Sequence, residues 1–310
     1  LWFFMPNNLC AIFIEGNLAR RLSMIFLPVF IYSVYKYLYN HKLRYIPLMV
    51  FTFLLMELCH LGYAGMVAIA VIIYGIVYII QKGRKKAVLD VVISMIFGFM
   101  LLGIWLVASL RGGITSLDNS ENMANFFQNL WITINPFERL TRGFEYFYFG
   151  FATLVVIVFG ILFGYKKSRT GFVTGFIILL MTTKSAYAVL KHLPGSQYLW
   201  MLRFISIALC MILMSFLMWD RLKKTLVWML CVLLVVDTIP SLSLIVGEHN
   251  DISVQERMAA RQDSTLISSA QAVTKQRLAL MDESILGATG SWLVSDYGNP
   301  VDATFGAGRE

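Results

Sequence analysis

Long apolar runs separated by short polar stretches recur along the first 240 residues. The runs cover about 22–39, 45–60, 63–80, 88–110, 144–164, 171–190, 199–219 and 225–240. A helix rises about 1.5 Å per residue and a bilayer hydrocarbon core is about 30 Å thick, so runs of this length are typical of membrane spans. The pattern therefore predicts an all-α polytopic membrane protein with about eight transmembrane helices.

The apolar stretch between the basic segments Asn40–Arg44 and Gln81–Lys86 has to contain two helices. A single helix over that stretch would be roughly 52 Å long, well beyond the hydrocarbon thickness. If both basic segments are cytoplasmic, an even number of spans must separate them. We therefore expect a helical hairpin that turns near His60 and Gly62.

Lysine and arginine are concentrated in four short loops, at 40–44, 81–86, 165–170 and 220–224. Basic residues in short loops mark the cytoplasmic side of a membrane protein. Both ends of the chain are then predicted to lie outside the cytoplasm. The sequence opens at Leu1 and stops in a glycine-rich stretch at Glu310, so we interpret it as a fragment cut at both ends.

The composition agrees with membrane insertion. Hydrophobic residues make up 58% of the chain and charged residues 14%, and the mean hydropathy is +0.70. Soluble domains have about 45–50% apolar and about 25% charged residues. The net charge of +8 resides largely in the short loops, which argues against nucleic acid as a partner. The four cysteines have no paired spacing, so neither a disulfide framework nor a metal knuckle is expected.

Two segments flank or interrupt the spans in the first 240 residues. Residues 1–21 form a juxtamembrane segment outside the cytoplasm, and 22–240 form the transmembrane domain. The longest outer loop is predicted to cover Arg111–Arg142. In it, Asp118 and Glu121 have capping-box spacing and open a helix near 119–134. Its apolar residues share one face, so Asn125 and Gln128 on the other side are expected to face water. This helix lies either flat in the membrane interface or on the protein's own outer surface.

After Pro240 the sequence becomes that of a soluble protein. Helical patterning runs from Ser253 to about Gln276, and short runs at Leu278–Met281 and Trp292–Ser295 have strand character. Residues 241–310 are therefore predicted to begin an extracytoplasmic α/β or α+β domain.

With this orientation, the ionisable groups in or beside the spans form one layer at the outer leaflet. Those that we consider candidates for ligand binding are Glu15, Arg20, Glu57, His60, Asp118, Arg203 and Asp237. Charges within spans are costly and usually mark function, which predicts a site opening on the extracytoplasmic face. The alternative is that each side chain simply reaches the interface.

Two pairs in this layer suggest specific chemistry. Glu57 and His60 are three residues apart, so on a helix they share a face and can hold a divalent metal as a Glu-x-x-His element does. Arg203 and Asp237 lie at similar depths on consecutive antiparallel spans and can form an ion pair. The residues themselves identify no catalytic base and no other cofactor.

Several short motifs match a known family. They are Glu15-Gly16-Asn17-Leu18-Ala19-Arg20, His60-Leu61-Gly62, Gly112-Gly113-Ile114, Asn135-Pro136, Phe305-Gly306-Ala307-Gly308 and the run from Leu193 to Phe204 around Arg203. Over essentially its whole length the chain resembles the bacterial integral membrane family labelled 6-pyruvoyl-tetrahydropterin synthase-related. The label does not imply pterin chemistry, because so apolar and basic a chain cannot be that soluble synthase.

The resemblance implies an architecture similar to that of GT-C membrane glycosyltransferases. Such enzymes transfer sugars from polyprenyl-phosphate donors at the outer face of the bacterial plasma membrane. It further implies that the catalytic acid lies in an outer loop that precedes Leu1, and that Arg203 is a candidate ligand for the donor phosphate. The competing hypothesis is a non-catalytic membrane protein, such as a lipid or glycan transporter or an envelope-assembly scaffold.

Overall fold

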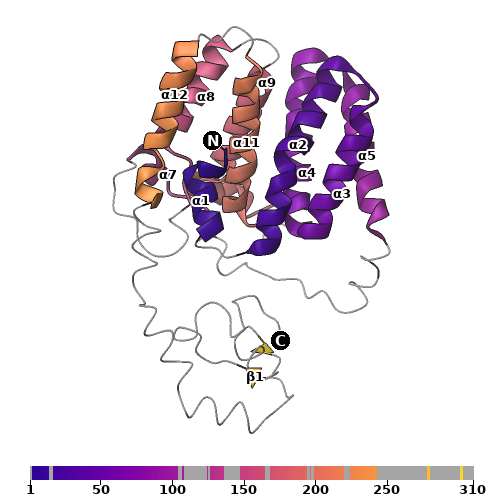
Figure 1. The fold of residues 1–310 in the computed structure, drawn as a ribbon, viewed down its shortest axis with the longest axis horizontal. Coiled ribbons are helices and arrows are strands. Elements are labelled where there is room, and N and C mark those ends of the chain that lie inside the picture. The colour runs from indigo at the N-terminus through magenta and orange to yellow at the C-terminus, as the bar shows by residue number, and fades with distance from the viewer. Residues whose placement is uncertain are drawn as a thin grey trace. The chain divides into compact units, whose positions relative to one another are not determined.

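The structure, a computed structural model, describes the chain in segments. These are residues 2–13, 17–103, 107, 124, 126–135, 147–164, 168–193, 196, 199–219, 224–242, 278–279 and 301–302. The elements along them (Figure 1) are η1 Trp2–Phe4, α1 Pro6–Phe13, α2 Leu18–Asn40, α3 Tyr45–Cys59, α4 Leu61–Lys82, α5 Lys85–Leu101, α7 Leu130–Ile134, α8 Phe151–Phe163, α9 Arg169–Met181, α10 Lys184–Leu190, η5 Met201–Arg203, α11 Phe204–Leu217, α12 Lys224–Val236, β1 Leu278–Ala279 and β2 Val301–Asp302. The chain divides into two compact units, Leu1–Ile114 with Asp118–Ser243, and Thr115–Leu117 with Leu244–Glu310.

Each of the eight apolar runs contains a helix, so their helical character is confirmed. Among the described residues, three helices are long and apolar enough to cross a membrane by themselves: Leu18–Asn40, Leu61–Lys82 and Thr225–Leu242. Shorter apolar helices cover Tyr45–Cys59, Phe151–Phe163, Arg169–Met181 and Met201–Leu217. A total of eight crossings remains a prediction.

The break predicted at His60 is confirmed. Helix α3 ends at Cys59, and His60 takes an extended conformation with φ −158° and ψ 94° before α4 begins at Leu61. The His60 ring caps the new helix, because its Nδ1 accepts a hydrogen bond of 3.0 Å from the backbone N–H of Tyr63. Helices α3 and α4 pack against each other, which makes this segment a tight hairpin.

Helix α11 lies at the centre of the first unit. It contacts α2 and α4 on one side and α8 and α9 on another, and Figure 1 shows it between the α2–α5 group and the α8, α12 pair. Every residue from Phe204 to Phe216 is buried except Met214, which is half-buried. A helix that is apolar all round belongs in the core. Polar side chains can therefore gather only near its ends.

Helix α9 approaches α11 closely because glycines face it. A Cβ added at Gly171 would overlap the side chain of Ser215, and one at Gly175 would overlap that of Ile212. In membranes, small residues four apart let two helix backbones come together and gain van der Waals contact. The Gly171-x-x-x-Gly175 spacing thus explains why α9 and α11 form one of the most extensive helix pairs in the unit.

The basic connections lie together at one end of the helices, which we call the basic end (residues 39–45, 81–86 and 168–170). Arg84 and His41, from two different connections, are hydrogen-bonded to each other. The Tyr39 hydroxyl is 2.8 Å from Thr170 Oγ1, which in turn donates to Gln81 Oε1 at 2.7 Å. These contacts join the ends of α2, α4 and α9, as the charge pattern predicted.

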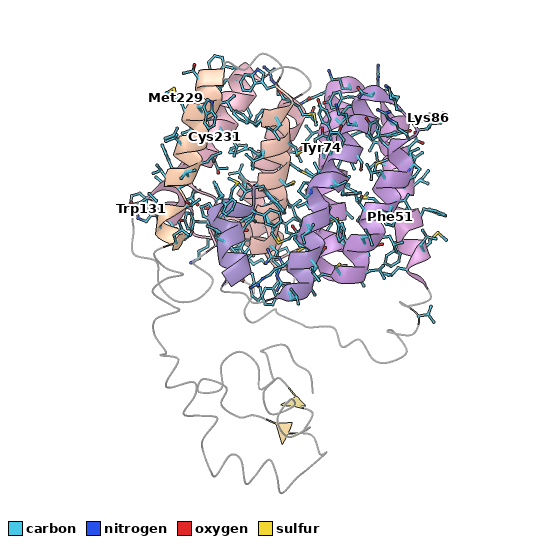
Figure 2. All side chains as sticks on the ribbon, in the orientation of Figure 1. Phe51, Tyr74, Lys86, Trp131, Met229 and Cys231 are labelled. Carbon is cyan, nitrogen blue, oxygen red and sulfur yellow. The ribbon has the colours of Figure 1, made fainter. Side chains whose placement is uncertain are left out.

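Large apolar side chains cover the outside of the unit. Phe51 is 58% exposed, Trp131 54% and Met229 59%. Figure 2 shows these three on the outer faces of the helices, whereas Tyr74 lies in the interior. Exposed apolar surface of this extent indicates contact with another apolar phase. Lipid hydrocarbon is that phase in a membrane protein.

The predicted helix over 119–134 is only partly present. Among the described residues, the α-helix covers Leu130–Ile134, with Asn129 as its N-cap. Gln128 is buried and pairs with the break between α9 and α10: its backbone N–H donates to Thr182 O at 2.8 Å, and its backbone O accepts from Lys184 N at 2.9 Å. Gln128 therefore does not face water as predicted. It satisfies backbone groups that the interrupted helix leaves open.

In the second unit, β1 and β2 pair in parallel, with Leu278 opposite Val301 and Ala279 opposite Asp302. Strand β1 falls within the run predicted at Leu278–Met281. The predicted helix from Ser253 to Gln276 and the strand at Trp292–Ser295 lie outside the described residues. The fold class of this unit remains a prediction.

The α9–α11 contact makes a test of the packing possible. We predict that Gly175→Ala lowers the midpoint of thermal unfolding in detergent, because overpacking a close contact costs about 1–3 kcal/mol. Gly65→Ala in α4 is the matched control, because a Cβ there meets nothing within 4 Å. It should leave the midpoint unchanged or raise it slightly. Equal midpoints for the two variants would show that α9 and α11 do not approach as described.

Candidate anion-binding site

Arg20 is the most deeply buried cation among the described residues. Helix α2 begins at Leu18, four residues before the predicted start, because the Asn17 side chain caps it by accepting a 3.0 Å hydrogen bond from Arg20 N. Arg20 therefore lies inside the helix, with 0% of its surface exposed, and not in the preceding segment. Its guanidinium carbon is 5.5 Å from the centroid of the Tyr63 ring at the start of α4.

Arg203 ends the short helix η5 and stands at the N-cap position of α11. Its guanidinium carbon lies 4.0 Å from the centroid of the Trp200 ring. The Phe126 ring stacks on the Trp200 ring, with the two ring centroids 4.4 Å apart. A guanidinium over an aromatic face is held by cation–π attraction. Phe126, which is distant in the sequence, thus helps to fix the ring against which Arg203 lies.

A hydrogen-bond network beside the two arginines joins η1, α4 and the start of α11. The hydroxyls of Tyr63 and Ser206 are 2.8 Å apart, and Ser206 Oγ also lies 2.9 Å from the backbone O of Arg203. The Trp2 indole N–H donates to Ser206 O at 2.9 Å. These bonds tie η1, α4 and α11 together at one place. We call this cluster of Trp2, Arg20, His60, Tyr63, Arg203 and Ser206 the arginine end.

His60 lies within reach of both arginines. The positive charges of Arg203 and Arg20 both act on its ring. In a neutral imidazole one ring nitrogen carries a proton and the other accepts. Since its Nδ1 accepts the N–H of Tyr63, the proton is assigned to Nε2, which makes that atom a hydrogen-bond donor.

The arrangement at the arginine end suits an anion. Arg20 lies over the Tyr63 ring, and the Tyr63 hydroxyl contacts Ser206, which is bonded to the backbone of Arg203. The two arginines therefore approach each other, although their helices are far apart in the sequence. Like charges in a low-dielectric interior repel, and an anion between them would offset that repulsion. Two guanidinium groups and an imidazole N–H are donors that match phosphate or carboxylate oxygens.

Glu57 and His60 do not form the element predicted for a metal. No hydrogen bond joins their side chains within the described part of the chain. Glu57 is 2% exposed, and its Oε2 comes within 3.8 Å of where a Cβ would stand at Gly98 of α5. The extended backbone at His60 ends the helical register, so the two side chains turn toward different helices. Over the described residues, no three His, Cys, Asp or Glu side chains gather where a metal ion could bind.

Asp237 has a different partner from the one predicted. Its Oδ2 accepts a 2.6 Å hydrogen bond from Ala152 N, in the first turn of α8. Asp237 therefore caps the N-terminus of α8, where the helix dipole stabilises a carboxylate. Gly150, with φ 87°, allows this approach, because a Cβ there would overlap the carboxylate. No ion pair between Asp237 and Arg203 occurs in the described residues.

The remaining candidates, Glu15 and Asp118, lie outside the described residues. Sequence reasoning missed Trp2, Tyr63 and Ser206 as members of the arginine end, and Trp200 as the ring that Arg203 lies over. Weak signals for two of them were present, since Tyr63 is three residues after His60 and Ser206 three after Arg203. On helices these spacings place the pairs on one face.

Comparisons with known proteins bear on the first unit. The family described as 6-pyruvoyl-tetrahydropterin synthase related domain, a membrane protein, matches residues 1–245. No curated protein and no solved structure matches the chain.

The capping role of Asp237 predicts how it combines with Arg203. In a double-mutant cycle of Arg203→Met and Asp237→Ala, the two changes in unfolding free energy should add to within about 0.5 kcal/mol. Asp237→Ala alone should cost about 0.5–2 kcal/mol because α8 loses its cap, and Asp237→Asn should cost less because its amide oxygen still accepts. Denaturant unfolding in detergent measures all four states. A coupling energy above about 1 kcal/mol would show that Arg203 and Asp237 interact directly and would contradict the capping role.

Proposed function

This chain belongs to the family of 6-pyruvoyl-tetrahydropterin synthase-related membrane proteins, and on that premise we propose that it is a GT-C-like glycosyltransferase of the bacterial plasma membrane. The proposed donor is a sugar linked to polyprenyl phosphate, and transfer takes place at the extracytoplasmic face. The arginine end is the proposed binding site for the donor phosphate.

The observation that carries the proposal is the convergence of Arg20 and Arg203. An arginine on a membrane helix costs several kcal/mol, and a second one beside it adds repulsion. Here one guanidinium is fully buried and the other lies over an indole ring. Arginine can bind a phosphate with two parallel hydrogen bonds. A bound phosphate would therefore explain why two arginines lie here and would offset the free-energy cost of burying them.

The aromatic surroundings support a lipid-linked ligand. Tyr63 and Trp200 flank the two guanidinium groups, and Phe126 extends the stack. Aromatic side chains with a polar tip favour the level of the lipid headgroups. A phosphate carried on a polyprenyl chain would lie at that level, with its hydrocarbon in the bilayer.

The proposed orientation follows from the positions of the two ends. Positively charged connections favour the cytoplasm, which puts the basic end there. The arginine end then opens on the extracytoplasmic side. In the same arrangement, all eight apolar runs cross the membrane, and residues 241–310 begin an extracytoplasmic α/β or α+β domain.

Binding of polyprenyl phosphate to the purified protein tests the site. We predict that Arg203→Lys and Arg20→Lys each weaken binding by at least about tenfold, because lysine keeps the charge but loses the bidentate fork. Arg21→Lys is the matched control, since Arg21 is the neighbour of Arg20 and does not belong to the arginine end. Scintillation proximity with labelled polyprenyl phosphate measures the affinity. Equal affinities for all three variants would contradict the proposed site.

Cysteine accessibility in intact cells tests the orientation. A single cysteine at Lys85 or Lys167 should be shielded from a membrane-impermeant maleimide, and one at Ser253 should be labelled. Permeabilised cells provide the control, because there all three positions should react. Labelling at Lys85 with protection at Ser253 would place the arginine end in the cytoplasm and reverse the proposal.

A further inference from the structure

A groove of about 340 Å³ lies between α2 and α11 near the basic end, far along α2 from Arg20. Helix α2 lines it with residues at positions three and four apart, which form one helix face: Tyr32, Tyr35, Lys36, Tyr39 and Asn40. The opposite wall consists of Met214, Leu217 and Met218. One wall is thus aromatic and polar, and the other is apolar.

The polar wall carries a cation. The ammonium nitrogen of Lys36 is 5.4 Å from the centroid of the Tyr32 ring, and no carboxylate pairs with Lys36 in the described part of the chain. A second cation is close, because the Tyr32 ring lies 6.3 Å from that of Tyr45, whose hydroxyl accepts a 3.1 Å hydrogen bond from Arg44. The groove therefore attracts anions.

The apolar wall is open to the membrane. Leu217 is 76% exposed, and Met214 and Met218 are half-buried. Tyr32 at the mouth of the groove is 37% exposed. Tyrosines favour the boundary between headgroups and hydrocarbon, which puts the groove at headgroup depth. A ligand there can place a polar group on one wall and a hydrocarbon chain on the other.

We propose that this groove binds one anionic phospholipid from the leaflet at the basic end. The lipid phosphate lies against Lys36, its headgroup hydroxyls meet the exposed amide of Asn40, and one acyl chain runs over Leu217. Basic pockets between membrane helices are known sites for anionic headgroups, and each basic side chain near the surface adds about 1 kcal/mol. The site is separate from the arginine end and does not depend on the proposed transferase activity.

Native mass spectrometry of the purified chain tests the proposal. The protein is incubated with phosphatidylglycerol or phosphatidylcholine of identical acyl chains, and the retained lipid is counted. We expect phosphatidylglycerol to be retained about fivefold more, the factor that one basic side chain supplies. Lys36→Met should abolish this preference and Lys36→Arg should keep it. Lys85→Met, an exposed lysine at the same end outside the groove, is the matched control and should also keep it.

Three results would overturn the proposal. The preference could survive in Lys36→Met, or it could fall equally in Lys85→Met, which would indicate diffuse surface charge. Alternatively, inorganic phosphate at millimolar concentration could displace phosphatidylglycerol, which would make a free anion the occupant. If Lys36→Met fails to fold by thermal unfolding, Asn40→Asp serves instead. The added carboxylate should repel the anionic lipid and remove the preference.

Discussion

The surroundings of α11 constrain the rest of the structure. Helices pack against it from several sides, and its length from Phe204 to Phe216 is almost entirely buried. A polar group along that length would need a partner in a low-dielectric interior. The polar chemistry is therefore confined to its ends. Arg203 and Ser206 stand at the first end, and the lipid-facing groove opens beside the last turn.

The same constraint links parts of the chain that are distant in sequence. Ser206 is a junction, because its hydroxyl meets Tyr63 of α4 and its backbone O accepts from Trp2. The Phe126 ring stacks on Trp200, while Gln128 in the same segment pairs with the break that follows α9. The cations at the arginine end are thus held by η1, α2, α4, η5 and the loop before α7 together. Such support over-determines the position of a costly charge, as expected at a functional site.

The sequence predicts features that depend on length and period. The hairpin at His60 follows because the apolar run is too long for one span, and the clustered basic connections follow from charge counting. Depth along the membrane is predictable in the same way, but the direction in which a helix faces its neighbours is not. The sequence predicts matching depths for Arg203 and Asp237, yet Asp237 faces α8 and caps it.

Two further differences arise from contacts that no local pattern encodes. The Asn17 cap extends α2 upstream and moves Arg20 into the helix, although a span read from hydropathy begins after both arginines. Gln128 lies on the polar side of a helical wheel, but it is buried because its backbone completes the interrupted helix at Thr182. In both cases backbone hydrogen bonding outweighs the apolar periodicity.

The central claim is that a lipid-borne phosphate binds between Arg20 and Arg203. Photo-cross-linking tests it most directly, with a polyprenyl phosphate that carries a diazirine next to the phosphate and with peptide mapping of the adducts. The account predicts adducts in the peptides around His60–Tyr63 and Trp200–Ser206, competed by unlabelled polyprenyl phosphate. Adducts confined to the basic end, or spread evenly over the lipid-facing helices, would contradict it.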